Sequence, residues 1–156
     1  MIIFQNYFKI LYILNDIWYN IVEKGYKMKN CRITITTTVE GNTTEIVRDG
    51  QAMLTPVSAR IAYCEENAEI SITLKDGELQ ILRRGDYSQE LRFKDGKTLA
   101  GKLGIGGVDG LIHTRTTRLS YSLSDFSLLL SLHYDLCIGD DPQSMKIRLF
   151  VKILDA

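Results

Sequence analysis

Hydrophobic and polar residues alternate along most of this chain with the period of two that is typical of β-strands. Two long alternating runs occupy 128–138 and 145–153, near the C-terminus. The turn residues Gly139-Asp140-Asp141-Pro142-Gln143 separate the two runs, so the pattern predicts an antiparallel hairpin. The same alternation recurs upstream, which predicts an all-β domain.

Shorter alternating or β-branched runs fill the region before this hairpin. The further strands are predicted at 32–40, 45–54, 60–65, 68–74, 79–84, 89–93, 98–103 and 111–123. Turn residues such as Asp76-Gly77 follow one another at short intervals, and no helix is predicted after Met28. Short connections between sequence neighbours favour an antiparallel up-and-down β-barrel of about 8–10 strands, with a β-sandwich as the alternative.

The first 27 residues differ from the rest, so we divide the chain into 1–27 and a barrel domain at 28–156. Nineteen of the 27 are Phe, Tyr, Met, Ile, Asn or Lys, the residues of A/T-rich codons. Three interpretations remain open: an amphipathic helix, a membrane anchor or signal, and a mis-assigned start. We favour the third, because Glu23-Lys24-Gly25 can be encoded by a purine-rich tract that resembles a ribosome-binding site, with Met28 shortly after it.

The charge balance bears on the kind of partner, and the cysteine count bears on the cellular compartment. Lys and Arg number 19, as do Asp and Glu, so the formal net charge is zero. This balance gives no electrostatic reason to expect nucleic acid or an anionic membrane as a partner. Three cysteines make an odd set, so we expect reduced thiols and a cytoplasmic protein. No metal or other cofactor is predicted.

The candidate ligand-binding residues are His113, Arg115, Tyr121 and Tyr134. His113 and Arg115 have the same strand parity as Leu119, so they would face the barrel interior if this strand is regular. Together with the two tyrosines they would line a polar, hydrated lumen that accepts a polar or anionic ligand. A bulge in this strand would reverse the parity and turn both residues to solvent, and this alternative remains open.

Other polar or glycine-rich groups have simpler interpretations. The segment Gly101–Gly107 lacks the order of a phosphate loop and predicts a hairpin or bulge in which glycines allow close backbone approach. Arg83 and Arg84 are interpreted as solvated strand ends. His133 and Cys137 share a strand face with Asp135 but lie about 13 Å apart, too far to bind one metal ion.

Several motifs also resemble a known family in their order and spacing. They are Leu74-Lys75-Asp76-Gly77-Glu78-Leu79 with Leu82-Arg83-Arg84-Gly85, Gly110-Leu111-Ile112-His113-Thr114-Arg115-Thr116, and His133-Tyr134-Asp135-Leu136 with Gly139-Asp140 and Met145-Lys146-Ile147. On these motifs the chain resembles the YwiB-like family of small bacterial proteins over about residues 30–154. The resemblance implies a calycin-like, lipocalin-like barrel of unknown function in the cytoplasm. By fold analogy alone it implies a small-ligand cavity, and it implies no catalytic residues.

Three functions are compatible with these observations. The first is a non-enzymatic barrel that binds a small, partly apolar ligand in its lumen. The second is a filled barrel that binds a protein or forms a homodimer through an outer face or edge strand. The third, a hydrolytic or isomerising enzyme, is the least favoured. A cavity inside the barrel would favour the first function over the second.

Overall fold

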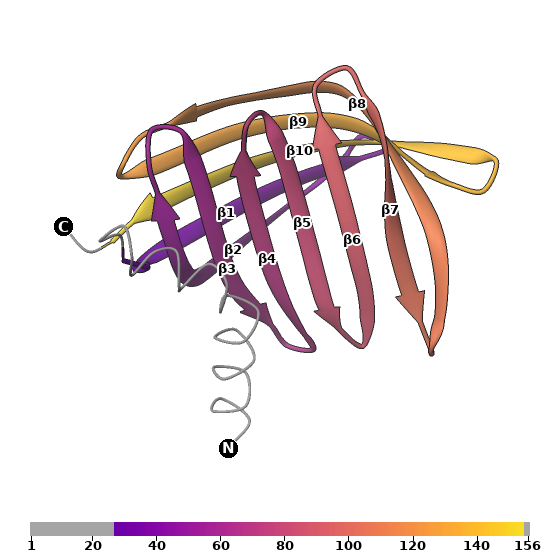
Figure 1. The fold of residues 1–156 in the computed structure, drawn as a ribbon, viewed down its shortest axis with the longest axis horizontal. Helices are drawn as coiled ribbons and strands as arrows, with labels where there is room; N and C mark the ends of the chain where they lie inside the picture. The colour runs from indigo at the N-terminus through magenta and orange to yellow at the C-terminus, as the bar shows by residue number, and fades with distance from the viewer. Residues whose placement is uncertain (1–26, 155–156) are drawn as a thin grey trace.

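A computed structural model describes residues 27–154 and shows ten antiparallel β-strands that follow one another along the chain (Figure 1). Each strand pairs with the next, and β10 returns to pair with β1, which closes the sheet into a barrel. The strands are β1 (Lys29–Val39), β2 (Asn42–Leu54), β3 (Ser58–Glu65), β4 (Ala68–Lys75), β5 (Glu78–Gly85), β6 (Tyr87–Lys94), β7 (Thr98–Ile105), β8 (Val108–Leu123), β9 (Ser127–Ile138) and β10 (Asp141–Ile153). The predicted up-and-down barrel is confirmed, and the sandwich alternative is wrong.

The N-terminal segment predicted at 1–27 lies outside the described residues, except for Lys27, which is exposed ahead of β1. Within the described part of the chain, no helix is long and apolar enough to cross a membrane.

Local turn chemistry explains how neighbouring strands are joined. Between β4 and β5, Asp76 and Gly77 have φ angles of 53° and 76°. Two successive positive φ angles produce the kind of tight turn that matches the twist of the flanking strands. The prediction of a hairpin turn at Asp76-Gly77 is therefore confirmed.

Alternate side chains on the strands point inward and form one hydrophobic core. Large inward residues at one end of the barrel are fully buried, and they include Ile33, Ile61, Leu74, Leu79, Phe93, Leu128 and Val151. At the other end, inward residues such as Ile35, Ile81 and Ile147 are only half-buried. The barrel is therefore densely packed at one end and less completely filled at the other.

Two walls of different strand length enclose this core. In Figure 1 the short strands β3 to β7 form one wall, and the long strands β8 to β10 run across them on the other side. Strands β3, β4 and β5 are each eight residues long, whereas β8 has 16 residues. The short wall carries most of the residues that position the candidate site.

Side-chain bonds complete the barrel where β6 and β7 separate. These strands pair only over 87–90 and 102–105, and beyond this stretch β8 contacts β6 instead. The Thr114 hydroxyl donates to the Arg92 carbonyl, and the Leu119 amide donates to the Asp95 carboxylate at 2.8 Å. Gly101 lies where the two strands separate. A Cβ at this position would lie 2.1 Å from the Glu90 carbonyl oxygen, so a residue larger than glycine would clash with the backbone. The predicted close backbone approach in this glycine segment is confirmed at Gly101.

Candidate ligand cavity in the barrel lumen

The register of the short wall arranges the inward side chains in rows around the barrel. Strand pairing places Ala59, Leu74, Leu79 and Phe93 in a deep row, and Ile61, Ile72, Ile81 and Leu91 in a middle row. The next row outward contains Tyr63, Ile70, Arg83 and Gln89, and we call it the rim row. Within the short wall, the rim row is where polar groups first join the apolar inward side chains.

A cavity of about 190 Å³ lies between the middle and rim rows and the opposite wall. The opposite wall contributes mainly aliphatic side chains from β1, β9 and β10. The complete lining is Ile35, Tyr63, Ile70, Ile72, Leu79, Ile81, Arg83, Gln89, Leu91, Leu130, Leu132, Tyr134, Ile147 and Leu149. Half-buried Ile35, Ile81 and Ile147 mark the end at which the cavity approaches solvent.

Arg83 places a fixed positive charge at this cavity. Its side chain is only 13% exposed, and its Nη2 lies 2.8 Å from a carboxylate oxygen of Asp86. Its Nη1 donates to the Tyr87 carbonyl at 2.7 Å, and the guanidinium stacks 3.6 Å above the centre of the Tyr87 ring. These contacts hold the guanidinium in one position, and the Arg83 bond lowers the pKa of Asp86.

Two buried tyrosines add hydroxyl groups to the lining. Tyr63 is 5% exposed and Tyr134 is 3% exposed. Burial raises the pKa of Tyr134 to about 12, and its ring meets Phe93 edge-on at 4.7 Å between centroids. Within residues 27–154, the structure records no hydrogen bond to either hydroxyl. Both hydroxyls are therefore neutral donors at physiological pH that a ligand could use.

Two further charged residues shift the pKa of Tyr63 in opposite directions. Burial raises the pKa of Tyr63 above its ordinary value, the Glu65 carboxylate raises it further, and Arg48 lowers it. Strand parity directs Arg48 and Glu65 to the inner side of the sheet, beside Tyr63. Together with the Arg83–Asp86 pair, they give this end of the barrel two positive and two negative groups.

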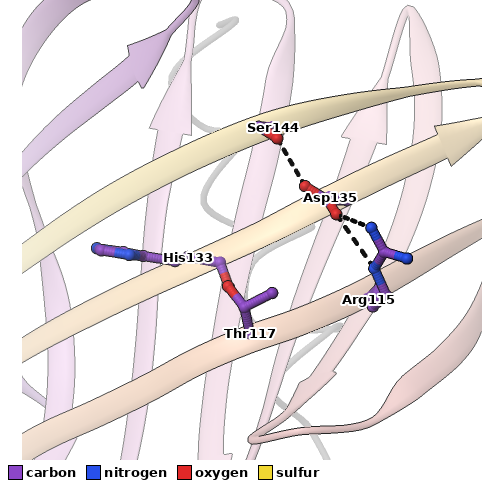
Figure 2. Close-up of polar contacts among 5 residues, drawn as sticks. All are labelled: Arg115, Thr117, His133, Asp135 and Ser144. Atoms are coloured by element: carbon purple, nitrogen blue, oxygen red, sulfur yellow. Dashed lines mark hydrogen bonds and ion pairs between the residues drawn. The ribbon is translucent and has the colours of Figure 1, made fainter.

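The inward placement that a regular strand would give His113 and Arg115 does not occur, because the pairing of β8 with β9 shifts register between Thr116 and Arg118. This bulge reverses the parity, so that Ile112, Thr114 and Thr116 are buried while His113 and Arg115 are exposed. Figure 2 shows Arg115 on the outer surface bonded to Asp135, whose other oxygen accepts from Ser144 at 2.7 Å. The bulge alternative was the correct one.

The structure places the two tyrosines predicted to bind a ligand in different surroundings. Tyr121 pairs with inward Leu130 and so has the expected parity, but it is 43% exposed and does not line this cavity. Tyr134 is buried and lines the cavity, as predicted. A role of any of the four residues in binding stays a prediction.

Sequence reasoning missed Arg83, Tyr63 and Gln89. The interpretation of Arg83 as a solvated strand end is wrong, since its side chain is mostly buried and lines the cavity. The sequence did contain a signal for Arg83, because Leu79, Ile81 and Arg83 occupy every second position of β5 and therefore share one face. An arginine that continues an apolar inward series is the pattern that would have identified it.

The outer face of β9 holds His133, Asp135 and Cys137, as the strand parity predicted. The Thr117 hydroxyl donates to the His133 carbonyl at 3.1 Å. Burial lowers the pKa of His133, and nearby Lys146 and Arg118 lower it further. Among residues 27–154, no group of three His, Cys, Asp or Glu side chains could hold a metal ion.

The fold and the cavity define a class of small closed β-barrels with a partly apolar lumen. A family described as a domain of unknown function, DUF1934, matches residues 27–149, and the chain belongs to this family. Its fold is similar to that in the "Crystal structure of ywiB protein from Bacillus subtilis", with a TM-score of 0.68 and 16% sequence identity. The similarity covers 84% of this chain and 96% of that chain. The search of curated proteins gave no match.

Proposed function

We propose that this protein binds a small, mostly apolar molecule with one anionic group, of the size of a six-carbon carboxylate, in the barrel lumen. The observation that carries the proposal is an apolar cavity of about 190 Å³ whose lining includes the largely buried guanidinium of Arg83, the positive member of the Arg83–Asp86 pair. A lumen that holds such a cavity supports a carrier over a filled interaction module.

The cavity volume limits the apolar part of the ligand. Apolar protein cavities of about 150 Å³ can hold benzene, whereas pockets for drug-sized ligands start at about 300 Å³. At about 190 Å³, this cavity suits a body of roughly six carbon atoms. The surrounding leucines and isoleucines would bury such a body without leaving polar groups unpaired.

The rim row supplies the polar end of the site. Arg83 uses one Nη1 bond and one Nη2 contact within the protein, and a guanidinium has five N–H donors. The remaining donors, the Tyr63 hydroxyl and the Gln89 amide lie in the same row and can bond a carboxylate. Bonds between charged partners are stronger than neutral ones, so an anionic head group is favoured over a hydroxyl.

Calorimetric titration with hexanoate and with hexan-1-ol tests this proposal. We expect hexanoate to bind at least about tenfold more tightly than hexan-1-ol, because only the carboxylate pairs with Arg83. The Arg83→Met variant should remove this preference, while Arg84→Met, at the neighbouring exposed arginine, should retain it.

A cavity-filling variant tests the location of binding. Ile72→Phe adds volume within the lining and should abolish hexanoate binding while the barrel remains folded by circular dichroism. The absence of hexanoate binding to the native sequence at millimolar concentration would contradict the proposal. Undiminished binding to folded Ile72→Phe would also contradict it, because the ligand would then lie outside the lumen.

A further inference from the structure

The outer face of β9, β10, β1 and β2 carries an apolar row that runs straight across four strands. Strand pairing aligns Leu129 with Phe150, Phe150 with Thr34, and Thr34 with Val47. Leu129, Phe150 and Val47 are 44%, 40% and 48% exposed. Single exposed apolar residues are ordinary, but an aligned row is a feature of a contact surface.

Charges of opposite sign flank this row on different strands. On β10, Lys152 and Arg148 lie on the outer face on either side of Phe150. On β2, Asp49 and Glu45 lie on either side of Val47. The two columns are about 10 Å apart, because only β1 lies between them.

This arrangement is self-complementary about a two-fold axis that runs parallel to β1, between the outer faces of two copies. Rotation about that axis places β10 of one copy against β2 of the other. The pairing rows then bring Lys152 opposite Asp49 of the second copy, Phe150 opposite Val47, and Arg148 opposite Glu45. A two-fold dimer repeats each of these contacts twice.

The residues on the axis are compatible with close approach. Thr34 and Thr36 are small, half-buried side chains in the centre of the face. Arg32 also lies near the axis, but it pairs with Asp49 of its own chain at 3.6 Å, which draws its charge to one side. The rows of Thr34 and Thr36 therefore present no large group on the axis, and the larger Arg32 lies one outward position further along β1.

We infer that this face, defined by Leu129, Phe150, Thr34 and Val47 with the flanking charges, is the interface through which two copies of this chain form a two-fold dimer. The inference is independent of the ligand proposal, since the inward and outward faces of the same strands carry different residues.

Sedimentation velocity measures the dimer directly. The native sequence should be dimeric in the high micromolar range. Phe150→Glu should be monomeric, and Phe126→Glu, at a more exposed phenylalanine outside the face, should remain dimeric. Circular dichroism confirms that each variant is folded.

A charge exchange distinguishes this interface from any other. Arg148→Glu and Glu45→Arg should each weaken the dimer by about a hundredfold, because both symmetry-related contacts become like-charged. An equal mixture of the two variants restores opposite charges at both contacts, so dimers should reappear. A monomeric native protein at all concentrations, a dimer that survives Phe150→Glu, or no recovery in the mixture would overturn the inference.

Discussion

Thr114 and Thr116 are two equally buried threonines on β8 with different hydrogen bonding. Each is 1% exposed. The Thr114 hydroxyl donates to the Arg92 carbonyl across the gap between strands, whereas the Thr116 Oγ1 has no partner among the described residues. A buried hydroxyl without a partner costs free energy, because it has lost its bonds to water.

We predict opposite effects when each threonine is replaced by valine. Thr116→Val should raise the free energy of unfolding by about 1 kcal/mol, because it removes an unpaired buried hydroxyl. Thr114→Val should lower it by about 1–3 kcal/mol, since the Arg92 carbonyl loses its donor. Urea denaturation of both variants measures the difference. Shifts in the same direction would contradict this account of the two hydroxyls.

Asp135 provides a prediction about pH. Hydrogen bonds from Arg115 and then Ser144 lower the pKa of Asp135 below its ordinary value. A carboxyl with a lower pKa in the folded state stabilises the fold at pH values above its unfolded pKa, about 3.9, and this contribution is lost as the pH falls toward the folded value. Asp135→Asn should therefore reduce stability at pH 7 by at most about 1 kcal/mol, because the pair is near the surface.

The same comparison at acid pH completes this test. Below the folded pKa of Asp135, the native sequence and Asp135→Asn should unfold with nearly equal free energies. In an Arg115→Met background, the Asp135→Asn change should have a smaller effect at pH 7. A difference between native and Asp135→Asn proteins that does not depend on pH would refute this assignment.

The bulge at Thr117 controls which face of β8 enters the barrel. Residues 112–116 point inward at even positions, whereas Leu119 points inward after the register shift. Deleting Thr117 would join Thr116 directly to Arg118, so that Ile112, Thr114, Thr116 and Leu119 would all stay inward in one regular alternation. His113 and Arg115 would stay on the outer face, and no charge would be buried.

We predict that deletion of Thr117 lowers the free energy of unfolding by only about 1–3 kcal/mol, because the same side chains stay inward and only local contacts of the bulge are lost. Thr117→Ala keeps the extra residue and loses only the bond to the His133 carbonyl, so it should cost about 1 kcal/mol. Thermal unfolding followed by circular dichroism compares the two. A deletion variant that no longer folds would contradict this account, because it would show that Thr117 does more than adjust the parity of β8.

At the level of elements, the sequence predicts strands well and single-residue irregularities poorly. Alternation and turn residues located all ten strands, and the Asp76-Gly77 turn followed from its own chemistry. The shift at Thr117 depends on how β8 must pair with β9 while it also contacts β6, and no local pattern encodes that. Because side chains alternate with a period of two, one extra residue was enough to misplace His113 and Arg115.

In the whole molecule, the closed barrel keeps its two candidate surfaces apart. Inward residues of β1, β9 and β10 line the cavity, and outward residues of the same strands form the inferred dimer face. Up-and-down closure was predictable from short loops, and the buried position of Tyr134 was predictable from parity. The cavity itself was not, because it depends on how side chains from opposite walls fill the lumen at one end.

Methyl NMR of the protein during titration with hexanoate tests the central claim most directly, because it shows where the molecule binds. We predict progressive shifts at methyl groups of the cavity residues Ile35, Ile72 and Leu132, and none at outer Val47 and Leu129. Shifts confined to Val47 and Leu129, or no shifts at millimolar hexanoate, would contradict the account of the lumen as a ligand site.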